Sequence, residues 1–266
     1  MRTDFTLDGY RALVSEFLKR GYTVCGFEDA SPHAAHLILR HDIDMSIQRA
    51  VALAEVEREL AVRSHYFVLL RTEMYNPFSA AGANGLRRLV ELGHDLGLHF
   101  DASLYPEERT TLEAAAEKEC AALEMLLQEP VRFISFHRPA HQLLGFSGSF
   151  AGRCNVYEQR FFEEIGYCSD SRGGWHHGHP LDHPNITAGR ALQLNTHPVW
   201  WDAYPGEGVK AKLDRFATER FDLLRCELGR NCGPYGAALA RLFGDERLLS
   251  APRCEISKDG QGQTKD

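Results

Sequence analysis

The chain has 266 residues, of which 44% are hydrophobic and 25% charged, a composition typical of a soluble globular protein. Its 30 Lys and Arg residues against 37 Asp and Glu residues give a net charge of -7, and no basic stripe follows the pattern of a phosphate backbone. No apolar run approaches the roughly 18 residues that span a bilayer, and the start of the chain lacks the apolar core of a signal peptide. We therefore expect no nucleic-acid partner and no membrane span.

The seven cysteines are odd in number and scattered, without a C-x-x-C pair. This spacing argues against a disulfide framework and against a cysteine zinc site, and it favours a reducing, cytoplasmic location. No shift in composition separates one half of the chain from the other. We expect a single catalytic domain over residues 1–254, followed by a disordered tail over residues 255–266 whose apolar content is too low to pack.

In chain order, apolar residues at helical spacing between residues 7 and 18 predict an amphipathic first helix. Short apolar runs then predict six strands, at residues 37–44, 64–70, 94–101, 132–138, 166–171 and 191–198. Helical patterns fill the first gaps between these strands, at residues 46–60, 76–92 and 106–127, with Ser46 as N-cap of the first. From residue 202 onward the pattern is helical with polar connections.

Strands that alternate with helices predict a parallel sheet, either a closed β/α barrel or an open doubly wound sheet. In both architectures the active groups gather at the carboxyl ends of the strands. Polar residues end most of the predicted strands: Asp42, Asp44, His99, Asp101, His137, Arg138, Asp170 and His197. This repetition predicts a functional site at that edge of the sheet.

Asp42 and Asp44 are two residues apart on one strand, so both carboxylates project to the same face. A bound cation would neutralise this pair and leave one carboxylate to act as a base. The alternative is an aspartate that caps the next helix. His99 and Asp101 stand in the same relation at the end of a later strand, which favours the metal-site interpretation.

Five segments in this order resemble the motifs of the polysaccharide deacetylases with a NodB-type domain, also called carbohydrate esterase family 4. The segments are RHDID (40–44), GHDLGLHFD (93–101), SFHRPA (135–140), SDSRGGW (169–175) and QLNTHPVWW (193–201). The resemblance covers roughly residues 37–201. It implies an α/β fold of the distorted (β/α) barrel type, one divalent metal ion, usually zinc, and removal of an N-acyl group from an amino sugar.

The resemblance also implies a role for each matching residue: Asp42 as general base, Asp44 and His99 as metal ligands, Arg138 as the orienter of the base, Asp170 as partner of the acid, and His197 as general acid. Where the family carries a further histidine in its second motif, this chain has Ser103. We predict that His137 supplies the third ligand, with Asp101 as its rival. Neighbours on a strand point to opposite faces, so His137 and Arg138 can both enter the site only if the strand ends or bulges before Pro139.

The chemistry is coherent on the residues alone. A metal with three protein ligands and an open position lowers the pKa of bound water to about 7, and Asp42 can take the water proton. An amine leaves poorly unless it is protonated, a task that suits His197. We expect Trp175, Trp200 and Trp201 to bind substrate by stacking on sugar rings, with core packing as the alternative for the last two.

The densest histidine cluster is the loop that carries His176, His177, His179 and His183. We interpret it as a Gly- and Pro-rich loop rather than a ligand set, although a substrate lid or an adventitious metal site would also fit the pattern.

Three functions fit these residues. The first is an active zinc deacetylase on an N-acylated sugar, in the synthesis of a surface glycan such as an O-antigen. The second is hydrolysis of another non-peptide C-N bond, in a linear amide or a cyclic ureide. The third is a non-catalytic metal- or sugar-binding protein that kept the fold. We favour the first because the base, two ligands, an arginine and a candidate acid are all present.

Overall fold

The computed structural model describes residues 4–139, 143–144, 147–204 and 206–243. By its internal contacts the chain divides into two compact units, residues 1–209 and 210–266. All the strands lie in the first unit, and the second contains α6 (Val209–Asn231) and α7 (Gly233–Phe243). The single domain over residues 1–254 stays a prediction, and the predicted tail over 255–266 lies outside the described residues.

The strands of the first unit form one parallel sheet in the order β6-β5-β4-β3-β2-β8-β7, with β1 paired to β2 beside this path. Their bounds are β1 (Thr23–Val24), β2 (His36–Ile43), β3 (His65–Val68), β4 (Asp95–Asp101), β5 (Phe133–His137), β6 (Cys154–Asn155), β7 (Gly166–Ser169) and β8 (Leu192–Thr196). Consecutive strands β6 and β7 lie at opposite ends of this order, and no pairing between them occurs in the described part of the chain. The sheet is thus a curled, incompletely closed barrel, which confirms the predicted distorted (β/α) barrel.

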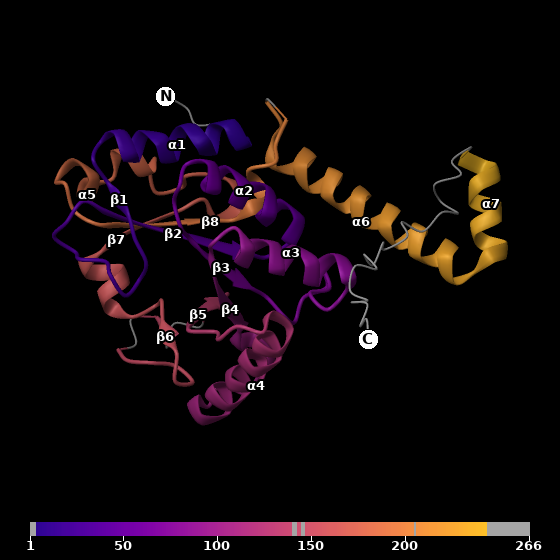
Figure 1. Cartoon of the computed structure of the whole chain (residues 1–266), viewed down its shortest axis with the longest axis horizontal. Helices are drawn as coiled ribbons and strands as arrows, with labels where there is room; N and C mark the ends of the chain where they lie inside the picture. The colour runs from indigo at the N-terminus through magenta and orange to yellow at the C-terminus, as the bar shows by residue number, and fades with distance from the viewer. Residues whose placement is uncertain (1–3, 140–142, 145–146, 205, 244–266) are drawn as a thin grey trace, which may run out of the picture. The chain divides into compact units, whose positions relative to one another are not determined.

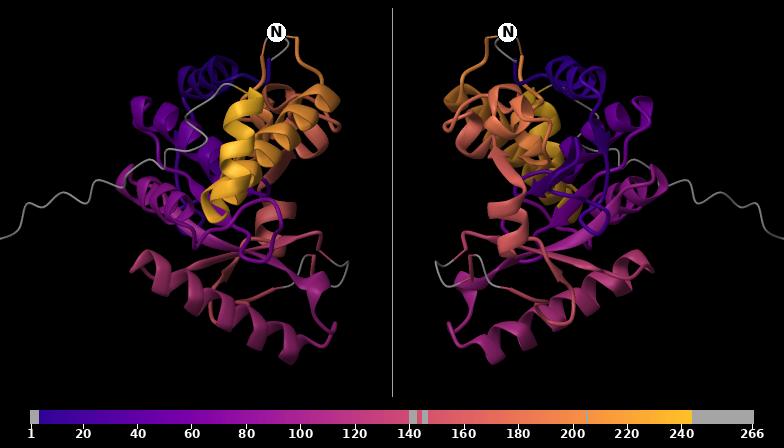
Figure 2. Two further views of the ribbon diagram at one scale, coloured as in Figure 1. Left: turned by 90° about the vertical axis from the view of Figure 1, so that its right-hand side faces the viewer. Right: turned by 90° about the vertical axis from the view of Figure 1, so that its left-hand side faces the viewer.

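Helices α1 (Leu7–Lys19), α2 (Ile47–Glu59), α3 (Ala80–Glu91) and α4 (Arg109–Leu127) contact one another in turn along the outside of the sheet (Figure 1), and Figure 2 shows the same elements from two sides. A short helix, α5 (Pro184–Thr187), precedes β8. Ser46 caps α2, as predicted, by accepting a hydrogen bond from the backbone N–H of Arg49. No helix among the described residues is both long and apolar enough to cross a membrane.

The inner face of the sheet is polar where β2 and β8 lie side by side. Alternation along β2 turns Arg40 and Asp42 to the same face. Gln193 and Asn195 face them from β8, where Arg40 pairs in register with Asn195. All four side chains are buried. The barrel interior therefore holds a layered set of hydrogen-bonding groups below the carboxyl ends of the strands.

Gly97, in the middle of β4, allows this interior to pack closely. A Cβ atom at that position would come within 2.6 Å of the Phe67 ring on β3 and within 2.8 Å of the Phe133 carbonyl oxygen on β5. These contacts are too short for any side chain, so only glycine fits. The close approach fixes the position of β4 between β3 and β5, and with it the position of His99 two residues further on.

On the outer face, a buried carboxylate ties α1 and α2 to the sheet. Glu57, on α2, has no exposed surface. Four side chains lie within hydrogen-bond distance of its two oxygens: Tyr10 (2.6 Å), His41 (2.8 Å), Ser64 (2.7 Å) and Tyr66 (2.7 Å). His41 also lies 2.7 Å from the Thr196 hydroxyl through Nδ1. The network joins β2 to β8 one residue before Asp42 and one residue before His197.

Glu57→Gln should lower the free energy of unfolding by about 3 kcal/mol, because an amide nitrogen replaces an acceptor of two buried donors. Burial alone would raise the pKa of Glu57, but the charge and hydrogen bond of His41 lower it to about 2. The stability that depends on this ionised carboxylate is therefore present above its ordinary pKa and is lost as the pH falls towards 2. Urea unfolding at neutral and acidic pH measures both effects.

Glu59→Gln is the matched control. Glu59 ends the same helix, its side chain is 62% exposed, and it pairs only with Arg11 among the contacts found. Its loss should cost less than about 1 kcal/mol. Equal destabilisation by the two substitutions would contradict the structural role of the Glu57 network.

Candidate metal and catalytic site

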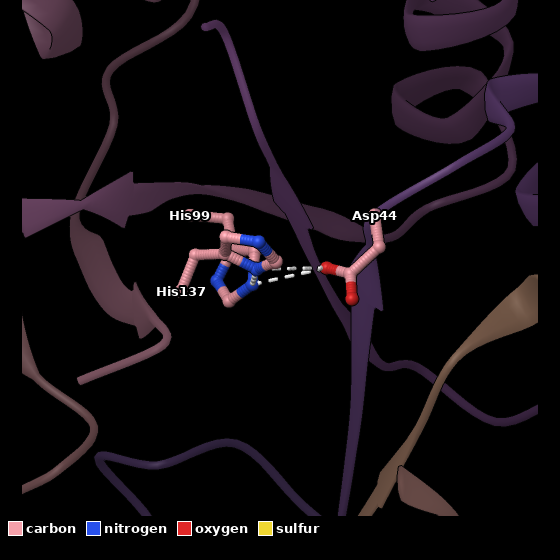
Figure 3. A group of neighbouring side chains, drawn as sticks. All are labelled: Asp44, His99 and His137. Atoms are coloured by element: carbon pink, nitrogen blue, oxygen red, sulfur yellow. Dashed lines mark hydrogen bonds and ion pairs between the residues drawn. The ribbon is translucent and has the colours of Figure 1, made fainter. Parts of the chain in front are cut away.

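Three predicted ligands meet at the carboxyl ends of β2, β4 and β5. Asp44 follows β2 directly, His99 lies near the end of β4, and His137 is the last residue of β5. In a flat sheet β2 would lie about 10 Å from β4 and about 14 Å from β5, so the curl of the sheet brings Asp44 to the two histidines. Figure 3 shows both imidazoles facing the Asp44 carboxylate.

The distances among the three donor atoms fit one metal ion. Asp44 Oδ1 lies 3.1 Å from His99 Nε2 and 3.4 Å from His137 Nδ1, and these two nitrogens are 3.1 Å apart. Zinc with bonds of about 2.0 to 2.1 Å in tetrahedral geometry places neighbouring donors roughly 3.3 Å apart. The three donor atoms therefore have the spacing that one zinc ion would require, and they would leave a position open for a further ligand.

The hydrogen bonds around the site leave one acceptor without a donor. The Arg138 Nε–H donates to His137 Nε2 (2.9 Å), His137 Nδ1 faces His99 Nε2, and His99 Nδ1 lies 2.7 Å from the Ser135 hydroxyl. This series of donors uses the ring protons of both histidines. Asp44 Oδ1 is buried and accepts no hydrogen bond from the described residues. A buried anionic oxygen beside two ring nitrogens is the environment that a divalent cation completes.

Electrostatics keep Asp44 ionised. Burial alone would raise its pKa, but the interactions with His137 and His99 hold the pKa of this carboxyl well below its ordinary value. A metal at His137 Nδ1 would displace the ring proton to Nε2, which then no longer accepts from Arg138. A metal on Nδ1 and the hydrogen bond from Arg138 to Nε2 would therefore exclude each other, because the neutral ring carries one proton.

Asp42 lies directly below this triad and is almost completely buried. Arg40 Nε and Nη2 donate to its two oxygens at 3.0 and 2.8 Å, and Asn195 Nδ2 donates to Oδ2 at 3.1 Å. Burial alone would raise the pKa of Asp42, but the charge of Arg40, helped by His99 and His197, lowers it. The carboxylate is therefore ionised and held in one orientation.

Arg138 does not orient Asp42, contrary to the role that the motif resemblance implied. It follows the last residue of β5, adopts a left-handed backbone conformation with φ of 48°, and its side chain is exposed. The strand thus ends at His137, and Arg138 lies beyond it, where its Nε–H donates to His137 rather than to Asp42. The guanidinium that contacts Asp42 belongs to Arg40, which we did not predict as a site residue.

His197 and Asp170 form a tight pair on the other side of Asp44. His197 Nδ1 lies 2.6 Å from Asp170 Oδ1, and the His197 backbone N–H donates to the same carboxylate at 3.0 and 3.1 Å. Burial alone would lower the pKa of His197, but the hydrogen bond and charge of Asp170, with Asp44 and Asp42 nearby, raise it to about 9. His197 Nε2 lies 3.9 Å from Asp44 Oδ2, so a protonated nitrogen faces the metal site.

Two of the three tryptophans expected to bind substrate are buried. Trp200 is 5% exposed and Trp201 is 0% exposed, so neither ring offers a face to a sugar. Trp201 instead donates from Nε1 to Asp170 Oδ2 at 2.8 Å and packs against Tyr10. Trp175 is half-buried and stacks on Phe5. The expectation is therefore wrong for Trp200 and Trp201, because strand alternation does not reveal which aromatic rings the core covers.

Asp101 does not join the ligand group. Its Oδ1 accepts from the backbone N–H of Ser103 at 3.0 Å and from the Ser103 hydroxyl at 2.5 Å. The residue thus caps the turn that follows β4. Ser103 is the partner in this cap.

The histidine-rich loop takes a structural role, as interpreted. His179 and His183 each accept through Nδ1 the backbone N–H two residues further on, at 3.3 and 3.2 Å. His176 and His177 are exposed. In the described part of the chain, only Asp44, His99 and His137 bring three possible donors together.

Arg40, Asn195 and Ser135 are site residues that the sequence analysis missed. Each lies two residues before a residue that it did select, namely Asp42, His197 and His137. The same-face rule for strands, applied towards the barrel interior as well as towards the carboxyl ends, would have found all three.

No model of a protein family and no curated protein matches the chain. Among solved structures, the chain is similar to a family 4 carbohydrate esterase from Bacillus anthracis, with 14% identity, a TM-score of 0.41, and coverage of 78% of this chain and 86% of the other. A deacetylase from Streptococcus pyogenes, in complex with acetate, shows 13% identity, a TM-score of 0.42, and coverage of 78% and 85%. A CE4 family pseudoenzyme from Bacillus anthracis shows 12% identity, a TM-score of 0.38, and coverage of 73% and 63%.

Proposed function

We propose that the chain is a metal-dependent hydrolase that removes the N-acyl group of an amino sugar in a glycan or glycan precursor. The observation that carries the proposal is that three metal donors, an oriented carboxylate and a carboxylate-paired histidine converge at one edge of the sheet. The five motifs that resemble polysaccharide deacetylases supply these residues and point to a C-N bond other than a peptide bond.

Asp44, His99 and His137 would hold one divalent ion, and we propose zinc because two imidazoles with one carboxylate are a frequent donor set of catalytic zinc. Bound there, the ion would polarise the amide carbonyl and lower the pKa of a water molecule to about 7. The three donors meet although the second motif has Ser103 in place of histidine. This completeness favours the active hydrolase over a non-catalytic binding protein.

Asp42 and His197 divide the proton transfers between them. Asp42 accepts the proton of the attacking water, since it is ionised and fixed by Arg40. His197 donates from Nε2 to the departing nitrogen, which leaves poorly unless protonated. Asp170 holds the opposite ring nitrogen and stabilises the charged imidazole.

The substrate and location are further parts of the proposal. A precursor of a surface glycan such as an O-antigen, free or nucleotide- or lipid-linked, would meet this enzyme in the cytoplasm. The six cysteines in the described part of the chain are all free, which fits a reducing compartment.

The purified zinc-loaded chain should release acetate from N-acetylated amino sugars in a panel of free, nucleotide-linked and oligomeric substrates, and removal of the metal by a chelator should abolish release. The same panel includes a linear amide and a cyclic ureide. Hydrolysis of only these last two would replace deacetylation with the alternative C-N reaction, and no hydrolysis of any member would refute the proposed function.

Substitution of each ligand should weaken zinc binding. Asp44→Ala, His99→Ala and His137→Ala should each lower the affinity by more than about 100-fold, since each leaves two protein ligands. Asp101→Ala and the surface variant His176→Ala should bind as the wild type does. Competition with a coloured chelator measures all five. A loss of affinity in Asp101→Ala without one in His137→Ala would show that the ligand set is wrong.

Asp170→Asn should shift the alkaline limb of the activity profile to lower pH. His197 acts while protonated, so activity falls as the pH rises through its pKa, which Asp170 raises. Removing that negative charge lowers the pKa, and the fall begins earlier. Asp95→Asn, at the amino end of β4, is the control and should leave the limb in place. An unchanged limb in Asp170→Asn would exclude His197 as the acid.

A further inference from the structure

Among the described arginines, Arg40 alone has its whole side chain enclosed in the barrel, with 0% of its surface exposed. Besides its two bonds to Asp42, it donates from Nη1 to Gln193 Oε1 at 3.3 Å and from Nη2 to the Tyr157 hydroxyl at 3.1 Å. Its guanidinium carbon lies 4.7 Å from the Tyr157 ring centre and 5.4 Å from that of Phe67. Every side of the guanidinium is thus in contact with a partner, so it can take few other positions.

The two parallel hydrogen bonds from the Arg40 guanidinium hold both carboxylate oxygens of Asp42 in place. A carboxylate has about four lone-pair positions, and three donors occupy three of them: Arg40 Nε on Oδ1, and Arg40 Nη2 with Asn195 Nδ2 on Oδ2. One position on Oδ1 is left by these three donors. Oδ1 is also the oxygen on the side of His99, at 3.9 Å from Nδ1. The arrangement selects Oδ1 as the atom that receives a proton.

We infer that Arg40 is the positioning residue of Asp42, a role that the motif resemblance had implied for Arg138, and that it directs the base to accept protons at Oδ1. This inference rests on the proposed hydrolase function. Arg40 contacts Asp42, Gln193 and Tyr157 and none of the three candidate metal ligands, so it would act through Asp42. It therefore affects the reaction step rather than substrate binding or metal binding.

A double-mutant cycle in kcat tests this dependence. Arg40→Lys keeps the positive charge but cannot form the two-pronged contact, so kcat should fall about 100-fold, with KM and zinc affinity within about threefold of wild type. In the Asp42→Asn background, where the base is already absent, the same substitution should lower the residual kcat by less than about threefold. Arg138→Lys is the matched control: whatever its effect on kcat, the factor should be the same in both backgrounds.

Stability provides a readout that needs no substrate. Arg40→Met should unfold at lower urea concentration than the double variant Arg40→Met/Asp42→Asn, because the single variant leaves a buried carboxylate without its counter-charge. If the losses in kcat caused by Arg40→Lys and Asp42→Asn multiply in the double variant, Arg40 does not act through Asp42. A loss of zinc affinity in Arg40→Lys would likewise overturn the role of Arg40. Either result leaves hydrolysis by the wild type unaffected. Failure of the zinc-loaded wild type to hydrolyse any substrate would refute the proposed function, and the role of Arg40 with it.

Discussion

The burial of ionised carboxylates governs this structure, because a carboxylate removed from water is stable only when donors or counter-charges replace the lost hydration. Three acids have donors on both carboxylate oxygens. Glu57 has four donors, Asp42 has Arg40 and Asn195, and Asp170 has His197 and Trp201. Asp44 is the exception, since its Oδ1 faces two imidazoles and accepts no hydrogen bond from the described residues. Asp44, whose Oδ1 lacks a hydrogen-bond donor, is also the acid whose surroundings have the dimensions of a metal site.

Charged neighbours also shift the pKa values of the two proposed proton-transfer groups in opposite directions. The neighbouring Arg40 lowers the pKa of Asp42, and the neighbouring Asp170 raises that of His197 to about 9. Near neutral pH the first is therefore a carboxylate and the second an imidazolium, which are the forms that a base and an acid need. A low pKa also makes Asp42 a weak base. The proposed hydrolysis would then depend on acidification of the attacking water, which a divalent ion at Asp44, His99 and His137 would supply when bound.

Sequence patterns predicted the parallel sheet, six of its strands and the edge at which the site lies, because strand periodicity and chain order are local properties. They also selected Asp44, His99 and His137, which the structure brings together. The two-residue strands β1 and β6 were missed because they are too short to show a period. Burial of Trp201 and the bond of Arg40 to Asp42 depend on how the sheet curls, and no single segment encodes that curl.

Strand geometry also explains why Arg40, and not Arg138, contacts Asp42. Asp101 caps the turn after β4 with Ser103, and His137, the last residue of β5, is the third possible donor beside Asp44 and His99. Arg138 lies beyond the end of β5 in a left-handed conformation with φ of 48°, and its exposed side chain donates to His137 Nε2 rather than to Asp42. Asp42 would remain a buried charge without a cation unless one came from elsewhere. Arg40, two residues earlier on the same face of β2, is placed to supply it. The alternation of side chains along β2 thus places Asp42 and the arginine that neutralises it on one face of the same strand.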